Sequence, residues 1–277
     1  MARYEVFVPA APPKLPVDLT LRLEADHWLG ALKTGLGRLG EAQASNNVLC
    51  DIQADGSIHV TDPDTGRVFR ILELPALTPV AAPPVAAPPA EPKAPVPVPP
   101  RPIGRLVATT RAEDVLAELF LEVSDLGQMQ DRKLGLEFVL DNALRIIGCE
   151  AGSVFTADLG RRDLSFEVVR GPTADKLMSL GLKVPIGVGV VGFCAQENVC
   201  VAVSDVEKDP RFYRAVSEAT GYQTRSLLCA PMARQGRVVG CLEVLNKKGG
   251  KPYDQKDMAV LSYLAAQAAA FLARIDG

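Results

Sequence analysis

The first 74 residues alternate between apolar and polar positions in a way that predicts short strands around one helix. The runs YEVFV and LTLRLEA have the period of two that is typical of half-buried strands. In ADHWLGALKTGLGRLGE the spacing becomes helical, and the apolar face carries Trp28, Leu29, Leu32, Leu36 and Leu39. The runs VLCDIQ, SIHVTD and RVFRILEL predict three more strands, joined by ADG and PDTG turns. We predict a small α+β module at residues 1–74. It contains no paired nucleophile and base, so we expect it to be an interaction module.

Residues 103–277 combine helical and strand periodicities. Helical spacing covers RAEDVLAELFLEVSDLGQM, where we expect a helix at 111–127, and LGLEFVLDNALRIIG. Two hairpins are predicted in AGSVFTADLGRRDLSFEVVRG and RSLLCAPMARQGRVVGCLEVLNK. Between them come a short strand and helix (KVPIGVGVVGFCAQEN), a strand (VCVAVSD) and a helical excursion (DPRFYRAVSEAT). The pattern predicts an α+β fold, in which helices pack on an antiparallel sheet.

The last predicted helix, at 254–275, is the most apolar segment of the chain. It is rich in Ala and interrupted by Ser262, Tyr263 and Gln267. A membrane span needs about 20 predominantly apolar residues. We therefore predict a packed amphipathic helix here and no membrane partner.

A Pro- and Ala-rich stretch at residues 75–102 separates the two parts. Proline removes backbone donors and favours an extended polyproline conformation, so the stretch is expected to be a semi-rigid linker. A docking peptide for a proline-reading domain is the alternative.

Composition and charge exclude several classes of protein. The net charge of −3 and the absence of a basic run argue against nucleic acid as a partner. The first residues lack the pattern of a secretory signal, so we expect a cytoplasmic protein. The six cysteines form no Cys-x-x-Cys pair and mostly lie in apolar runs, which indicates reduced, buried thiols and no metal site. Neither His27 nor His59 lies near a cysteine cluster.

The segment IGVGVVG satisfies G-x-G-x-x-G through Gly187, Gly189 and Gly192, and Asp209 lies near the acidic position of a dinucleotide fingerprint. A dinucleotide fold would need a full crossover helix before the next strand. The short segment that precedes VCVAVSD leaves no room for one, which excludes this fold. A glycine-rich turn that opens a helix still directs backbone N–H groups at a ligand, and this arrangement suits a phosphate.

Consecutive motifs after this turn carry a family resemblance. They are Gly-x-x-Gly, Asp-Pro-Arg-Phe, Thr-Gly-Tyr-x-Thr, Leu-x-Cys-x-Pro and a closing Asn-Lys. With them, residues from about 111 to 277 resemble the GAF domains of cyclic nucleotide phosphodiesterases and adenylyl cyclases. The resemblance implies a GAF-type antiparallel sheet with helices packed on it. It does not extend to the N-terminal module.

Cyclic-nucleotide-binding GAF domains carry an Asn-Lys…Phe-x-x-x-Asp-Glu signature. This chain has Asn246-Lys247, Tyr253 in place of Phe, and Asp257 followed by Met258 in place of Glu. The resemblance implies an ion pair between Lys247 and Asp257 that fixes a turn to the last helix.

The resemblance also implies a ligand pocket. Backbone amides that contact the cyclic phosphate match Val190 and Val191, with a further contact near Tyr213, and Ser153 matches a residue under the base or ribose. Two threonines that hydrogen-bond the nucleotide match Thr220 and Thr224, and an acidic residue that reaches the ribose matches Glu243. Two aspartates of family members are replaced by Arg170 and Ser217, which leaves the base unassigned.

The residues present argue against three other known functions of GAF domains, which are bilin attachment, haem binding and reduction of free methionine sulfoxide. Bilin attachment and haem binding need a histidine, and this domain has none. The His-Ile-Ala-Cys-Asp segment of free-methionine-sulfoxide reductases is replaced by DPRFYRAVS, although Cys194 and Cys200 lie near the corresponding region. We therefore expect no enzyme activity and no cofactor.

Two functions stay open. The first is a signalling module whose GAF domain binds a small ligand, with a cyclic nucleotide favoured, and forms a homodimer through the helices at 111–127 and 254–275. The second is a ligand-free GAF dimer that serves as a scaffold, with residues 1–74 binding a protein partner.

Overall fold

A computed structural model describes residues 1–41, 47–53, 55–62, 65–75 and 125–276 of the chain. The Pro-rich linker beyond Pro75 and the expected helix at 111–127, up to residue 124, lie outside these residues. Elements of the N-terminal module are β1 (Ala2–Val8), β2 (Leu19–Ala25), α1 (Trp28–Arg38), β3 (Asn47–Ile52), β4 (Ile58–Thr61) and β5 (Val68–Leu74). This is the order of strands and helix that the alternation predicts.

The second part of the chain contains both hairpins and the helices expected around them. Its helices are α3 (Arg132–Ile147), α4 (Ala174–Leu180), α5 (Gly189–Glu197), α6 (Arg214–Thr220) and α7 (Gln255–Ile275). Its strands are β6 (Cys149–Asp158), β7 (Asp163–Arg170), β8 (Lys183–Pro185), β9 (Cys200–Val203), β10 (Leu227–Arg234) and β11 (Arg237–Lys247). Helix α4 was not among the expected elements.

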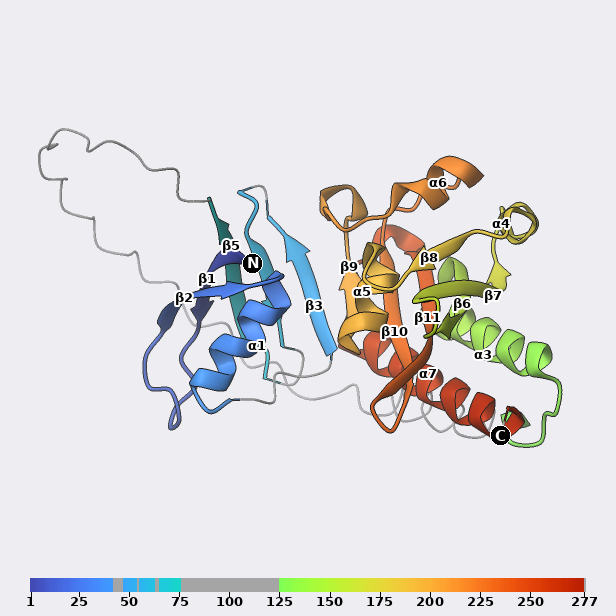
Figure 1. Ribbon diagram of the computed structural model, residues 1–277, viewed down its shortest axis with the longest axis horizontal. Helices are drawn as coiled ribbons and strands as arrows, with labels where there is room; N and C mark the ends of the chain where they lie inside the picture. The colour runs from blue at the N-terminus through green and yellow to red at the C-terminus, as the bar shows by residue number, and fades with distance from the viewer. Residues whose placement is uncertain (42–46, 54, 63–64, 76–124, 277) are drawn as a thin grey trace, which may run out of the picture.

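All described strands belong to one sheet, in the order β2-β1-β5-β4-β3-β9-β10-β11-β6-β7-β8. Every neighbouring pair is antiparallel except one: β3 of the N-terminal module runs parallel to β9, with Asn47 opposite Cys200 and Cys50 opposite Val203. Figure 1 shows these two strands side by side where the two parts of the molecule meet. The N-terminal module therefore extends the sheet of the second part.

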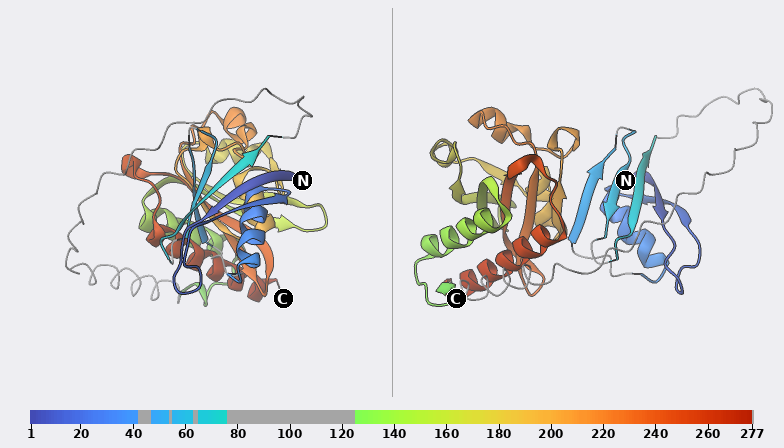
Figure 2. Two further views of the ribbon diagram at one scale, coloured as in Figure 1. Left: turned by 90° about the vertical axis from the view of Figure 1, so that its left-hand side faces the viewer. Right: turned by 180° about the vertical axis from the view of Figure 1, so that it is seen from behind.

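Helices pack on both faces of the sheet. Helices α1 and α5 pack on one face, whose buried side chains form a single apolar core that includes Trp28 and Val48 of the module and Phe193 and Val201 of the second part. Helices α3 and α7 lie against each other on the opposite face (Figure 2), over a second core that includes Leu136 and Leu264. Because the first core crosses the β3–β9 boundary, burial of apolar surface holds the two parts together.

Helix α7 has the length and composition of a membrane-crossing helix, alone among the described helices. Half of its most apolar window is buried inside the protein, and the helix packs on β10 and α3. Its buried face includes Met258, Leu261 and Leu264. The contacts agree with the packed amphipathic helix that the sequence predicts.

Candidate functional site

A small cavity lies between α5 and the sheet, on the face opposite α3 and α7. Its volume is about 70 Å³. The floor is formed by β6 and β11, through Ser153, Phe155, Glu243 and Leu245, and the walls come from α4, α5, α6 and the segment before β10. Apolar side chains dominate the lining, and the polar ones are Ser153, Ser217, Thr224, Glu243 and Tyr213.

Helix α5 directs its N-terminus at this cavity. Gly189, Val190 and Val191 line it, and no described side chain caps the helix. The first turn of a helix leaves N–H groups without intrahelical partners and carries a partial positive charge. These amides are the groups through which the cavity could bind an anion, because no Lys, Arg or His is among its lining residues.

Two glycines allow α5 to begin at this place. Gly189 has a φ of +70°, and a Cβ there would lie 2.9 Å from the Cβ of Tyr213. A Cβ on Gly192 would lie 2.5 Å from the carbonyl oxygen of Pro185. The glycine pattern that resembles a dinucleotide fingerprint therefore serves a tight turn and close packing against β8.

Glu243 is the acidic residue of the cavity. It lies on β11 opposite Ser153 of β6 and Cys229 of β10. Burial, together with the nearby Cys241, raises the pKa of Glu243 from 4.5 to about 8. At neutral pH the side chain is therefore largely a neutral acid, able to donate one hydrogen bond into the cavity as well as accept.

Stability should decrease as the pH rises from about 4.5 to 8 and then level off, because the folded chain holds the Glu243 proton more tightly than the unfolded chain does. One pKa unit corresponds to about 1.4 kcal/mol, and the cavity can hold water beside the carboxyl group. We expect a change of about 2–4 kcal/mol across this range. Urea unfolding at several pH values, compared with Glu243→Gln, measures it. A wild-type profile that matches the Gln variant would contradict the raised pKa of Glu243.

The segment before β10 forms one wall of the cavity and is held by Asn246. The Asn246 side chain accepts a hydrogen bond from the Arg225 amide at 2.7 Å and donates to the Gln223 carbonyl oxygen at 2.9 Å and the Tyr222 hydroxyl at 3.0 Å. These contacts bracket Thr224, which lines the cavity. Asn246 itself has a positive φ of 56°, a conformation that Asn tolerates better than most residues.

The Asn-Lys signature also fixes the start of α7. Lys247 pairs with Asp257, and Asp257 accepts a hydrogen bond from the Asp254 amide as part of a capping box. The hydroxyl of Tyr253, which is buried, donates to the Val244 carbonyl oxygen at 3.2 Å. The structure thus contains the ion pair that the resemblance implies, and its role here is to join the end of β11 to α7.

The structure places most of the candidate ligand residues together. The cavity is lined by Ser153, Val190, Val191, Tyr213, Thr224 and Glu243. Thr220 lies outside this lining: its hydroxyl donates to the Val216 carbonyl oxygen at 2.8 Å and accepts from the Tyr222 amide at 3.2 Å, which closes the end of α6. Arg170 also lies outside the lining and pairs with Asp141 and Glu137 of α3, whereas Ser217 reaches the cavity.

One residue next to the cavity was not among the sequence candidates. Arg211 precedes Phe212 and Tyr213, which line the cavity. Its guanidinium lies 4.7 Å from the Phe193 ring centroid and 5.3 Å from that of Trp28 on α1, and it pairs with the buried carboxylate of Asp209. The Asp-Pro-Arg-Phe motif (the DPRF segment, Asp209–Phe212) therefore joins one wall of the cavity to the N-terminal module.

Comparison with known proteins identifies the family. The GAF domain family model matches residues 134–272, half of the chain, and the chain belongs to this family. The dual 3′,5′-cyclic-AMP and -GMP phosphodiesterase 11A of Takifugu rubripes is 34% identical over 99 residues, which cover 35% of this chain and 11% of that protein. The cGMP-specific 3′,5′-cyclic phosphodiesterase of Drosophila pseudoobscura pseudoobscura is 24% identical over 160 residues, covering 52% of this chain and 14% of that protein.

A solved structure supports the fold. The GAF domain of a phosphoenolpyruvate-protein phosphotransferase from Coxiella burnetii aligns with a TM-score of 0.54 and 17% identity, over 60% of this chain and 97% of that one. The predicted GAF resemblance and α+β fold are confirmed. The chain matches only 11–14% of the length of the two phosphodiesterases, so their whole-protein activities are not carried over.

Proposed function

We propose that this protein is a non-catalytic regulatory module whose GAF cavity binds a small ligand, a 3′,5′-cyclic nucleotide being the first candidate. The observation that carries this proposal is the N-terminus of α5, which opens without a side-chain cap onto the cavity formed with Thr224, Ser153 and Glu243. Backbone amides suit a cyclic phosphate, and the polar groups on the floor suit a ribose or base.

Binding a nucleotide requires the cavity to open. Pockets for drug-sized ligands have volumes of about 300–1,000 Å³, against about 70 Å³ here. A second hollow of about 460 Å³ lies alongside and shares Phe212, Ser217 and Thr224 with the cavity. An outward movement of α6, which carries Ser217, would merge the two spaces. We therefore expect ligand binding to displace α6 and the DPRF segment.

Isothermal titration of the purified full chain with cyclic AMP and cyclic GMP tests the ligand. We expect measurable heat with at least one of them and about tenfold weaker binding for Thr224→Ala, because one hydrogen bond is worth about 1 kcal/mol or more. Thr220→Ala is the matched control and should bind normally, since the Thr220 hydroxyl is used within its own helix. Absence of heat with both nucleotides would remove this ligand class.

A ligand-free scaffold is the second candidate, and the small, mainly apolar cavity favours it. In that case the GAF domain would form a homodimer through its terminal helices, and residues 1–74 would carry the partner surface. Native mass spectrometry of the purified full chain separates the two functions. A dimer without any bound small molecule, together with silent titrations, supports the scaffold, whereas added mass of a nucleotide contradicts it.

A further inference from the structure

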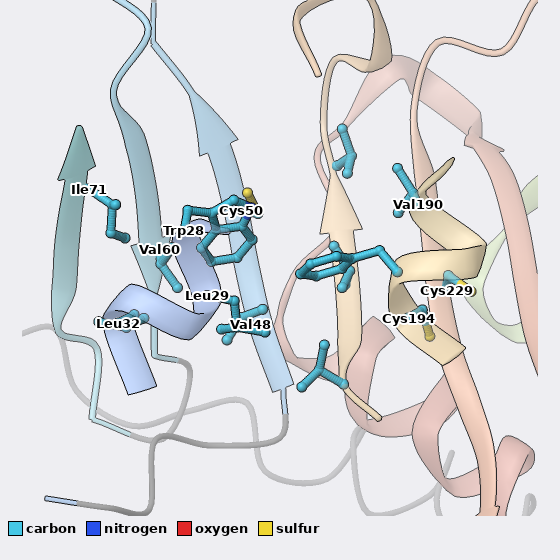
Figure 3. Packing of buried hydrophobic residues seen from close by; sticks show 14 of the residues in the cluster. Trp28, Leu29, Leu32, Val48, Cys50, Val60, Ile71, Val190, Cys194 and Cys229 are labelled. Atoms are coloured by element: carbon cyan, nitrogen blue, oxygen red, sulfur yellow. The ribbon is translucent and has the colours of Figure 1, made fainter. Parts of the chain in front are cut away.

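Three of the six cysteines meet beneath α5, although they are far apart in sequence. Cys194 lies on α5, Cys229 on β10 and Cys241 on β11, and their three Sγ atoms all lie within 4.8 Å of one another. Figure 3 shows Cys194 and Cys229 in the layer between this helix and the sheet. All three side chains are buried and free of disulfides.

Their arrangement follows from the sheet register. Cys229 is opposite Glu243 and Cys241 is opposite Pro231, so the two cysteines are diagonal neighbours on one face of the β10–β11 pair. Cys194 packs on these two cysteines from the helix, and its Sγ lies 3.9 Å from the Sγ of Cys241. The Sγ of Cys241 also lies 3.7 Å from the carbonyl oxygen of Val191. The three thiols thus converge on one point from three elements.

The geometry matches a three-coordinate metal centre. Metal–sulfur bonds of about 2.3 Å place the sulfur atoms of a trigonal site about 4.0 Å apart, close to the 3.9 Å between Cys194 and Cys241. Only small rotamer adjustments would bring the remaining sulfur distances, which are within 4.8 Å, to this value. The site is therefore largely formed in the folded chain.

The number and type of ligands select the ion. Structural zinc is almost always bound by four ligands, and the described part of the chain adds no fourth His, Cys, Asp or Glu to this group. Thiolates are soft ligands that select Cu(I), zinc and iron–sulfur clusters, and among these a site with three ligands fits Cu(I).

We propose that Cys194, Cys229 and Cys241 form a buried binding site for one cuprous ion. Each thiol that ligates the ion releases its proton, so binding weakens as the pH falls. This site is distinct from the ligand cavity, although Val191 touches both.

Anaerobic titration of the reduced full chain with Cu(I), in competition with bicinchoninate, tests the site. The ion is added both to the folded protein and during refolding, because the thiols are buried. We expect one Cu(I) per chain, with thiolate-to-copper absorption in the near ultraviolet. X-ray absorption of the loaded protein should show three sulfur neighbours. Failure to retain copper by either route, or a first shell of nitrogen and oxygen, would overturn the proposal.

Alanine variants locate the ion. Cys194→Ala and Cys241→Ala should each weaken Cu(I) binding by more than the roughly 10–100-fold that loss of a supporting group costs at a metal site. Cys200→Ala is the matched control: Cys200 is also buried, but in the core on the opposite face of the sheet. Equal retention by wild type and both cluster variants would place the copper elsewhere, as would loss in Cys200→Ala alone. Zinc retained more tightly than copper would also contradict the assignment.

Discussion

Replacing Arg211 with Ala should lower the free energy of unfolding by about 3–5 kcal/mol. This is the cost of leaving one partner of a buried ion pair without the other, and the Asp209 side chain is only 1% exposed. Two of the Arg211 nitrogens bond the Asp209 carboxylate, and a third contact reaches Cys50 of β3 at 3.7 Å. Urea unfolding of the full chain gives the magnitude.

The same variant should loosen the junction between the two parts of the molecule. Arg211 lies against both Trp28 and Phe193, whose rings stack with centroids 5.8 Å apart. Faster hydrogen exchange in β3 and β9 is therefore expected. The matched control is Arg214→Ala, since Arg214 pairs with Glu207 at the surface, where both side chains are more than half exposed. An exposed pair is worth less than about 1 kcal/mol. Equal losses in the two variants would contradict a special role for Arg211.

Replacing Asn246 with Ala should cost about 3–4 kcal/mol. The variant removes the acceptor for the Arg225 amide and the donor to the Gln223 carbonyl oxygen, in two part-buried hydrogen bonds, and a hydrogen bond contributes about 1 kcal/mol. It also places Ala at a φ of 56°, which is strained by about 1–2 kcal/mol. Thermal or urea unfolding measures the decrease in the free energy of unfolding. Ligand binding should weaken as well, because Asn246 no longer holds the segment that carries Thr224 in place.

Two glycine variants separate the hydrogen bonds from the backbone conformation. Asn246→Gly removes the strain but not the lost contacts, so it should be about 1 kcal/mol more stable than Asn246→Ala and still clearly less stable than wild type. Gln235 has a similar φ of 51° in the exposed β10–β11 turn, and Gln235→Gly should be neutral or slightly stabilising. An Asn246→Gly variant as stable as wild type would show that only the backbone conformation matters.

These contacts suggest a physical route from the cavity to the N-terminal module. Phe212 and Tyr213 line the cavity, and the adjacent Arg211 contacts Trp28 across the junction. A second contact there joins Glu197 of α5 to His27 and Lys33 of the module, at 3.1 and 3.4 Å. If a ligand displaces the DPRF segment, the strength of the junction should change with it. Hydrogen exchange in β3 with and without ligand would follow this coupling.

The local elements could be predicted because each depends on nearby residues. Alternation along YEVFV and LTLRLEA predicts β1 and β2, and the motifs from Gly187 to Lys247 predict the GAF fold and most of the cavity lining. Thr220 matched the family motif in sequence, but its hydroxyl is within reach of its own helix backbone and bonds there. The position of Thr220 within the motif could not show where its hydroxyl points, because the direction of a side chain depends on the conformation of the local turn.

By itself, the sequence determined the order of the described strands and helices except α4, the GAF family and the Lys247–Asp257 pair, since periodicity and motif spacing are local properties of the chain. Only the tertiary structure decided that β3 pairs with β9, that Arg211 lies between Trp28 and Phe193, and that Cys194, Cys229 and Cys241 meet. These contacts join residues separated by long stretches of chain. They depend on sheet register and on the packing of one element against another, which no local pattern of residues specifies.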